Sequence, residues 1–200
     1  MADSNITKRA LAGALKELME EMPFAKINIS DICGKCNMNR KSFYYHFRDK
    51  YDLVNWIFDT EFIAMASQKN FDSGWAFFAE VCRFLDADRD FYRRAMQIKG
   101  QNSFFDHFRE SLLPIIAEYM KPYTSGQEPQ PFHVTFFADA LLCAIERWLL
   151  SKNAMPADEF SKEVRACFRG LALGVYQEMN EEERQDYRAS LDRSLNNSNP

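Results

Sequence analysis

Cationic, hydroxyl-bearing and aromatic side chains are concentrated in one short stretch of this chain, residues 39–50. Its sequence is NRKSFYYHFRDK. Arginine and lysine bind phosphate oxygens as charged donors, and the planar guanidinium fork also fits the two acceptor atoms of one guanine. Serine, tyrosine and histidine add further donors. These residue types, gathered on one short helix, favour contact with double-stranded DNA.

Two short helices on either side of a tight turn are expected to hold this stretch. The side chain of Asn28 can cap the first helix, which runs to Cys36. Asn37 tolerates the left-handed backbone of a turn, and Asn39 caps a second helix that ends near Phe47. A helix this short does not persist alone in water, so packing must hold it. The inward side of the second helix carries Phe43 and Phe47, with Tyr45 packed against them, and its outward side carries Arg40, Lys41, Ser42, Tyr44 and His46.

The stretch from Thr7 to Leu53 resembles the DNA-binding domain of the TetR family of bacterial transcriptional regulators. The similarity is carried by Arg40-Lys41, by the run Phe43-Tyr44-Tyr45-His46-Phe47 and by Lys50 at the start of the next helix. It implies a regulator that binds a pseudo-palindromic DNA operator as a homodimer, with one half-site for each recognition helix.

The side chains on this surface have different expected roles. We expect Arg40 to read a base edge, because its fork can contact both acceptors of a guanine. His46 has a structural alternative, a hydrogen bond that holds the end of its own helix. Lys41 and Ser42 are expected to make secondary contacts with bases or phosphates. The family positions of Tyr44, His46 and Lys50 imply phosphate contacts. Asn39 caps the helix at the same surface, and Thr7 and Lys8 are expected to contact the DNA backbone.

A weaker similarity to one TetR subgroup continues to the end of the chain. It is carried by residues 100–104 (GQNSF), by residues 132–150 with Glu146-Arg147-Trp148-Leu149, and by Met155-Pro156. Members of this subgroup are often labelled dihydroxyacetone-kinase regulators. The common mode of the family implies a repressor that is relieved by a small-molecule effector. The alternative is an activator, or a regulator that responds through a protein co-regulator.

The charge distribution agrees with this interpretation. Residues 1–50 carry nine Lys and Arg against six Asp and Glu, a balance of +3, whereas residues 51–200 carry 16 against 23, a balance of −7. A basic head on an acidic body approaches a polyanion in one orientation. The polar N-terminus and the lack of an apolar run of about 20 residues predict no secretory signal and no membrane segment. Five cysteines without disulfide spacing indicate a reducing cytoplasm.

Other groups capable of chemistry do not form a recognisable active site. Cys33 and Cys36 have the spacing of a redox or zinc motif, but no second ligand pair lies near and both fall on the buried face of their helix. A core role is favoured, and a redox role stays open. His107 and His133 stand alone, and the sequence has no nucleophile elbow, phosphate loop or matched carboxylate pair. We therefore expect that the protein is not an enzyme and that it binds no metal and no cofactor.

Hydrophobic residues recur at helical spacing through nearly the whole chain, which predicts an all-α fold. Residues 1–50 are expected to form the helix-turn-helix domain, 51–195 a helical effector-binding and dimerisation domain, and 196–200 a disordered polar tail. The stretch 122–131, with its prolines and glycine, predicts an exposed loop. Beyond the helix-turn-helix pair, helices are expected at about 4–22, 50–70, 73–86, 89–99, 103–121, 131–151, 157–180 and 181–195.

Phenylalanine is unusually abundant, with 18 residues, and many lie between residues 62 and 137. The family resemblance implies that the middle helices enclose an effector pocket. A dense core explains any single one of these residues equally well. The expected pocket residues are Phe62, Met65, Trp75, Phe78, Phe104, Phe108 and Phe137.

Two late helices, within residues 132–150 and 157–180, are rich in apolar residues. The first is apolar around most of its circumference, which requires burial on several sides. In a small chain a second subunit is the simplest cover, and a monomer that uses the same residues as core is the alternative. Gly170 and Gly174 lie four residues apart, a spacing that suggests close helix approach. The expected interface, a four-helix arrangement by family resemblance, contains Leu141, Ile145, Trp148, Phe168, Gly170, Leu171, Gly174 and Val175.

Overall fold

The computed structural model describes residues 2–100, 103–121 and 128–196, and every regular element in these ranges is helical. The all-α prediction is confirmed. The elements are α1 (Ala2–Glu21), η1 (Phe24–Lys26), α2 (Ile29–Lys35), α3 (Arg40–His46), α4 (Lys50–Phe58), η2 (Asp59–Ile63), α5 (Ala64–Ala66), α6 (Gly74–Ala87), α7 (Arg89–Met96), α8 (Phe104–Met120), α9 (Pro131–Leu150), α10 (Ala157–Glu178) and α11 (Glu181–Asn196).

Most predicted helices begin and end within a few residues of the observed ones. The predicted loop at 122–131 lies mainly outside the described residues, and within its described part α9 begins at Pro131. The predicted tail is outside them too, except for Asn196, the last residue of α11. None of the described helices combines the length and apolar character needed to cross a membrane.

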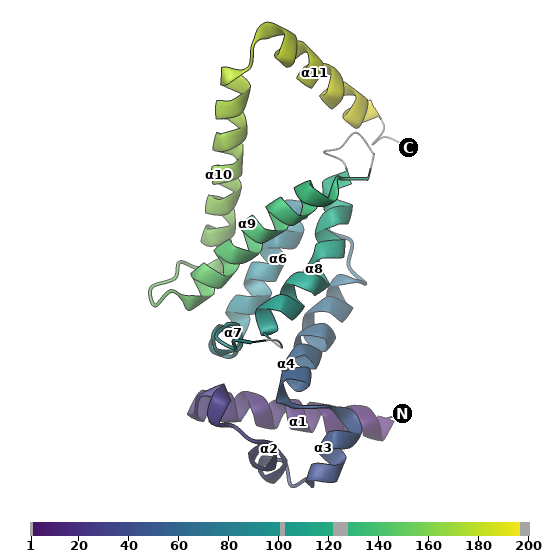
Figure 1. The fold of residues 1–200 in the computed structure, drawn as a ribbon, viewed down its shortest axis with the longest axis vertical. Coiled ribbons are helices and arrows are strands. Elements are labelled where there is room, and N and C mark those ends of the chain that lie inside the picture. Colours follow the sequence, from purple (N-terminus) through teal and green to yellow (C-terminus); the bar gives the residue numbers. More distant parts are fainter. Residues whose placement is uncertain (1, 101–102, 122–127, 197–200) are drawn as a thin grey trace.

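The helices form a small head and a longer body (Figure 1). We call α1 to α3 the head and α4 to α11 the body. In the head, α1 lies across α2 and α3, and α4 leads from the head into the body. The middle of the body consists of α6, α8 and α9, while α10 runs past them and α11 turns back from its far end.

Side-chain caps and a left-handed residue shape α2 as the sequence predicts. The Asn28 side chain accepts a hydrogen bond from the Asp31 backbone at 3.0 Å, and the Asp31 carboxylate accepts one from the Asn28 backbone at 2.8 Å. At the other end Asn37 has a φ of 54°. The Met38 N–H then donates to the Cys33 carbonyl at 2.8 Å, which closes the helix end. The position of α3 is set by this turn.

The head has an apolar core of its own. Leu11, Leu15 and Met19 of α1 are fully buried together with Ile32 of α2 and Phe43 of α3. Because Phe43 occupies the inner side of α3, the opposite side of that short helix faces away from the core. The packing that a helix of this length requires is therefore present.

A π-helical turn interrupts the single helix that the sequence predicts for residues 50–70. It is η2, in which the Ala64 N–H donates to the Asp59 carbonyl. The turn leaves Phe58 and Phe62 both fully buried, with ring centroids 5.5 Å apart. π-turns within helices are frequent at functional sites. This one lies where the chain passes from the head into the body.

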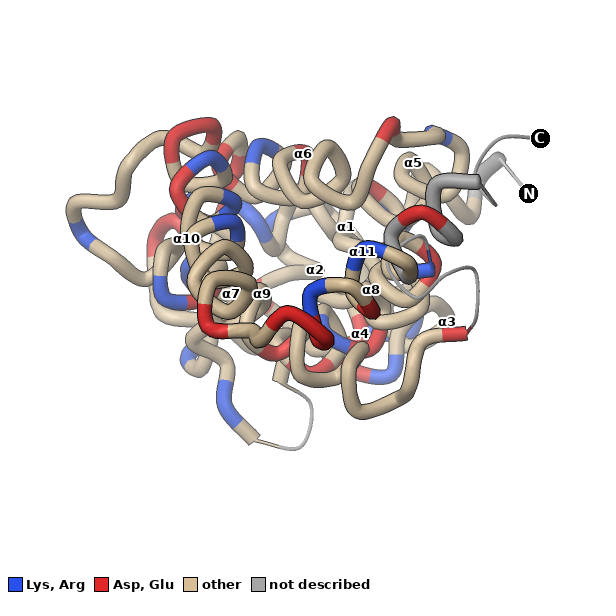
Figure 2. The backbone as a smooth tube through the Cα atoms, turned by 90° about the horizontal axis from the view of Figure 1, so that it is seen from above, with Lys and Arg blue, Asp and Glu red and all other residues tan. Residues whose placement is uncertain are grey.

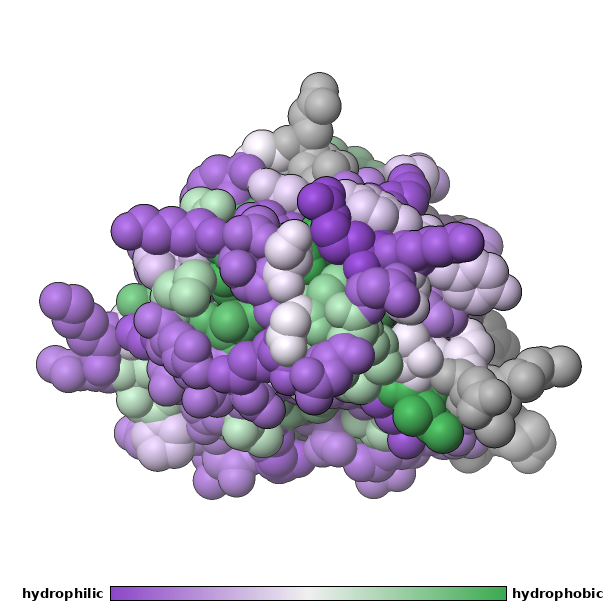
Figure 3. Space-filling model, turned by 90° about the horizontal axis from the view of Figure 1, so that it is seen from below, coloured by the Kyte–Doolittle hydropathy of each residue, from purple (hydrophilic) through white to green (hydrophobic). Residues whose placement is uncertain are grey.

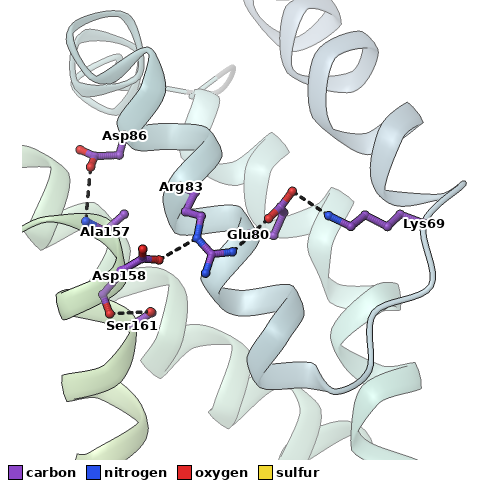
Figure 4. A network of polar contacts seen from close by, with 7 residues as sticks. All are labelled: Lys69, Glu80, Arg83, Asp86, Ala157, Asp158 and Ser161. Carbon is purple, nitrogen blue, oxygen red and sulfur yellow. Dashed lines mark hydrogen bonds and ion pairs between the residues drawn. The ribbon is translucent and has the colours of Figure 1, made fainter.

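Polar contacts fasten the first turn of α10 to α6 (Figure 4). The Arg83 guanidinium donates to the Asp158 carboxylate at 2.6 Å. The Asp86 carboxylate accepts from the backbone N–H of Ala157 at 3.3 Å, at the N-terminus of α10, where a negative charge is favourable. Elsewhere on the body, basic and acidic residues are interspersed along the chain (Figure 2). The start of α10 is therefore held within its own chain.

Candidate nucleic-acid interface and ligand cavity

Asn39 fixes the start of α3. Its Oδ1 accepts hydrogen bonds from the Ser42 backbone N–H at 2.9 Å and from the Ser42 hydroxyl at 3.2 Å. Two of the side chains predicted to touch DNA therefore hold the helix N-terminus. Arg40 and Lys41, which lie between them in the sequence, are exposed.

The outer face of α3 carries a cation and two tyrosines. The Arg40 guanidinium lies over the Tyr44 ring, 5.9 Å from its centroid, and donates to the Tyr44 hydroxyl at 3.4 Å. Tyr45 is 83% exposed, so its predicted position in the core is wrong. The exposure of Tyr45 could have been predicted from the sequence, because Tyr45 follows Lys41 by one helical turn and lies on the same face of the helix. Tyr45 thus belongs to the outer surface with Arg40, Lys41 and Tyr44.

Lys50 does not point outward. Its ammonium donates to the carbonyl oxygens of Phe24 and Ile27 at 2.7 and 2.6 Å, and to that of Ala25 at 3.4 Å. Burial lowers the pKa of Lys50 below its ordinary value of 10.5. All three donors of the ammonium are used within the head. In this structure Lys50 has a structural role in place of the predicted phosphate contact, because its hydrogen bonds join the start of α4 to η1.

The remaining predicted contacts surround α3. The half-buried His46 ring packs edge-on against Tyr45 with centroids 4.9 Å apart, and it makes no hydrogen bond among the described residues. The Lys8 ammonium lies 5.8 Å from the Phe47 ring centroid and 5.7 Å from that of Trp56. Thr7 is half-buried beside it on α1. The face seen from below, on the side of α2 and α3, is mostly hydrophilic (Figure 3).

Cys33 of α2 and Cys36, which follows that helix, pack into the core of the head. Cys33 is buried, and the Cys36 thiol donates to the Ile32 carbonyl at 3.3 Å. Burial raises the pKa of both thiols, which disfavours the reactive thiolate. Among the described residues, no three His, Cys, Asp or Glu side chains are grouped so that they could hold a metal ion. This environment is that of structural cysteines.

A charged contact joins the head to the body. The Lys16 ammonium of α1 lies 2.8 Å from a carboxylate oxygen of Glu61 in η2 and 2.8 Å from one of Asp88, between α6 and α7. Burial alone would lower the pKa of Lys16, but the hydrogen bonds to Asp88 and Glu61 raise it overall. Because Glu61 lies in the π-turn, a movement of that turn would change the contact between Glu61 and Lys16 of α1.

The body contains a cavity of about 660 Å³ between α6, α8, α9 and α10, and Tyr187 of α11 also borders it. Its lining is apolar and aromatic apart from two arginines, Arg165 and Arg169, which the sequence did not single out as pocket residues. The lining residues are Gly74, Trp75, Phe77, Phe78, Val81, Leu112, Ile116, Tyr119, Met120, Phe137, Leu141, Leu142, Ile145, Arg165, Phe168, Arg169, Leu171, Ala172, Val175, Met179 and Tyr187.

Only part of the predicted pocket borders this cavity. Trp75, Phe78 and Phe137 line it. Phe62, Phe104, Phe108 and Met65 do not: the first three are fully buried in an aromatic core around Phe58, and Met65 packs against that core. The helical spacing of aromatic residues could not separate core from cavity, because both lie on inward faces.

Comparison with known proteins agrees with the helix-turn-helix geometry. Residues 11–57 match the family described as bacterial regulatory proteins of the tetR family, and residues 75–170 match a transcriptional regulator C-terminal region. The chain is 30% identical over 151 residues to the HTH-type dhaKLM operon transcriptional activator DhaS of Lactococcus lactis subsp. lactis (strain IL1403). That alignment covers 74% of this chain and 81% of the relative. The chain belongs to the TetR family.

Solved structures of other TetR proteins share the fold. The dihydroxyacetone kinase operon activator DhaS superposes with a TM-score of 0.62 at 19% identity, covering 84% of this chain and 97% of that one. A TetR transcriptional regulator from Streptococcus agalactiae 2603V gives 0.63 at 19% identity, covering 81% and 93%. At 19% identity these two structures show a shared fold. The family matches and the relative at 30% identity make the protein a TetR-family transcriptional regulator and not an enzyme.

In this TetR-family member the predicted dimer residues differ in how far they are exposed. Ile145 and Trp148 are buried in the chain's own core, where Trp148 stacks on Phe160 with centroids 4.7 Å apart. Leu171 and Val175 are 71% and 51% exposed. Ile145 and Trp148 thus present no surface to a partner, which corrects their assignment. The other members are the half-buried Leu141, Phe168 and Gly174 and the exposed Gly170.

Further apolar surface, which the sequence did not single out, lies on the same two helices. Phe132 and Phe136 of α9 and Leu173 of α10 are exposed. A Cβ added at Gly170 or Gly174 would meet no atom within 4 Å, so these glycines face open space rather than a neighbouring helix of the described chain. These exposed apolar side chains of α9 and α10 are left uncovered by the described part of the chain.

Proposed function

We propose that this protein is a homodimeric, sequence-specific regulator whose hold on its DNA operator changes when a small molecule enters the cavity between α6, α8, α9 and α10. The observation that carries the proposal is the outer face of α3. Arg40, Lys41, Tyr44 and Tyr45 are exposed there, while Asn39 and the inner residues hold the helix in place.

Each exposed side chain suits one kind of contact. Arg40 reads a guanine edge, with its guanidinium held in line by Tyr44. Lys41 binds phosphate oxygens as a point charge. Tyr45 offers a ring and a hydroxyl at the same surface, and further backbone contacts come from the nearby side chains His46, Ser42, Thr7 and Lys8.

Dimerisation is supported by the exposed apolar surface of α9 and α10. Leu171, Val175 and Phe136 are more than half exposed in the single chain, and large apolar patches mark protein interfaces. One seven-residue recognition helix contacts few bases, whereas two copies related by a twofold axis contact two half-sites in successive major grooves. We assign the interface to these exposed residues together with Gly170 and Gly174. Because Leu171 and Val175 also line the cavity, a partner bound here would lie along one side of it.

Control by a ligand follows from the path between cavity and head. The cavity borders α6 and α8, and α8 packs against α4, which begins in the head. A ligand that fits one arrangement of these helices better than another shifts the population by its differential affinity. The Lys16 contacts with Glu61 and Asp88 carry that shift to α1.

The direction of regulation distinguishes two candidate functions. Repression relieved by an effector is the family's common mode. The relative that matches over 151 residues is an operon activator, which favours activation for this chain. A reporter gene placed behind the identified operator decides between them: transcription rises with the protein for an activator and falls for a repressor.

Selection of bound fragments from genomic DNA tests the DNA-binding part of the proposal. Wild type should enrich a short pseudo-palindrome, and Arg40→Ala should lose it. Arg93→Ala, which removes a partly exposed arginine from the body, is the matched control and should enrich the same sites. No enrichment by wild type above random DNA would contradict sequence-specific binding.

A further inference from the structure

We infer that the body cavity binds an amphipathic monocarboxylic acid, with its apolar chain among the aromatic residues and its carboxylate on Arg165 or Arg169. This inference rests on the proposed ligand control and names the class of ligand. The residues that line the cavity include two arginines and no aspartate or glutamate. A ligand that complements this lining carries a negative charge at one end and hydrocarbon elsewhere.

The face of α10 that borders the cavity separates charge from apolar surface. The lining residues of α10 are Arg165, Phe168, Arg169, Leu171, Ala172 and Val175, and Met179 follows directly after the helix. Apart from Leu171 they recur at helical spacing. Both guanidinium groups belong to the earlier part of this face, one turn apart, and only apolar residues follow. A carboxylate bound by the arginines would leave its chain lying along the apolar turns.

Neither arginine is neutralised by the described part of the chain. Arg165 and Arg169 are both exposed, and no ion pair or hydrogen bond joins either of them to a described residue. Other arginines of the body are paired: Arg83 binds Asp158, and Arg109 binds Asp139. A guanidinium beside apolar surface binds a carboxylate through charge-assisted hydrogen bonds, often as a bidentate pair.

An aromatic wall begins beside the arginines and would hold the hydrocarbon part of the ligand. The Phe168 ring contacts those of Trp75 and Phe137, with centroid distances of 5.4 and 5.8 Å. The volume of about 660 Å³ lies within the range of small-molecule sites, roughly 300–1,000 Å³. Few groups on this wall can hydrogen-bond, so sugars and nucleotides would lose their hydration without replacement.

Calorimetric titration of the full-length dimer with three matched probes tests the inference. The probes are dodecanoate, dodecanol and dodecyltrimethylammonium, each below its micelle concentration. Dodecanoate should bind at least about tenfold more tightly than dodecanol, because its charge gains hydrogen bonds to a guanidinium. The double variant Arg165→Gln, Arg169→Gln should lose this preference, and Lys162→Gln, an exposed cation of α10 outside the cavity, should keep it.

The outcomes separate the ligand class from the proposed function. Equal binding of dodecanoate and dodecanol, or tighter binding of the ammonium probe, would overturn the acid while leaving an apolar ligand site. No binding of any probe to a dimer that still selects its operator would mean that a partner subunit or protein fills the cavity, and would overturn both the acid and ligand control. Failure to select an operator would contradict the DNA-binding proposal alone.

Discussion

We expect replacement of Lys50 by methionine to weaken the fold of the head and not its contacts with DNA phosphates. The Lys50 ammonium donates to three backbone carbonyls, those of Phe24, Ala25 and Ile27. Methionine keeps an unbranched apolar stem but has no donor. The variant therefore removes these hydrogen bonds while it retains much of the packing between α4 and η1.

The expected loss of stability follows from these contacts. Hydrogen bonds that involve a charged group contribute about 1.5–3 kcal/mol each, and the two bonds shorter than 3 Å dominate here. The partial burial that lowers the pKa of Lys50 offsets part of this gain. We expect a net decrease of about 1–3 kcal/mol in the free energy of unfolding. For a chain of 200 residues this corresponds to a fall of roughly 2–12 °C in Tm.

Circular dichroism melting and a salt series of DNA binding, measured well below Tm, give the two readouts. Lys50→Met should melt earlier and keep the wild-type salt dependence. Lys41→Met, which removes an exposed cation of α3, should keep the wild-type Tm and reduce the salt slope by about 1. An unchanged Tm for Lys50→Met together with a reduced salt slope would refute the structural role and restore the phosphate contact.

Three further predictions concern other parts of the molecule. Arg40→Ala should weaken operator binding by about 1–3 kcal/mol and random-DNA binding by less, and equal losses in a competition assay would contradict base reading. Trp148→Ala removes the stack on Phe160 and should lower the free energy of unfolding in urea by about 3–5 kcal/mol, whereas a loss under about 1 kcal/mol would show that the stack is dispensable. Burial raises the pKa of Cys82 to about 12 from 9.0, so the stability gained by keeping this thiol protonated is full below pH 9.0 and is lost as the pH rises toward 12. Iodoacetamide should therefore label Cys82 of the native protein far more slowly than Cys82 of the urea-unfolded protein, as measured by mass spectrometry, and equal rates would contradict that burial.

The caps and turn of the head could be predicted because their signals are local. Asn28 and Asn37 act through backbone groups a few residues away, so the sequence around them contains the whole interaction. Lys50 is different, because its acceptors lie 23 to 26 positions earlier in the chain. A lysine at a helix start has the same local pattern whether it binds phosphate or its own backbone.

The body was harder to predict because helical periodicity identifies a buried face but not the group that covers it. Phe62 and Trp75 both lie on inward faces, yet one packs into the core and the other borders the cavity. The sequence predicts that Trp148 meets a second subunit, but Phe160 of the same chain covers it. Arg165 lacks any local signal, since its position at the cavity depends on how α10 crosses α6 and α9.

The contacts of Lys16 also bear on the order in which the chain folds. Its two acidic partners lie 45 and 72 positions later in the sequence. The contacts within the head are shorter in range, and contacts between distant segments form more slowly because more chain entropy must be lost. During synthesis the head should therefore close before Asp88 has left the ribosome. The newly made recognition helix would be complete before the body gains its connection to α1.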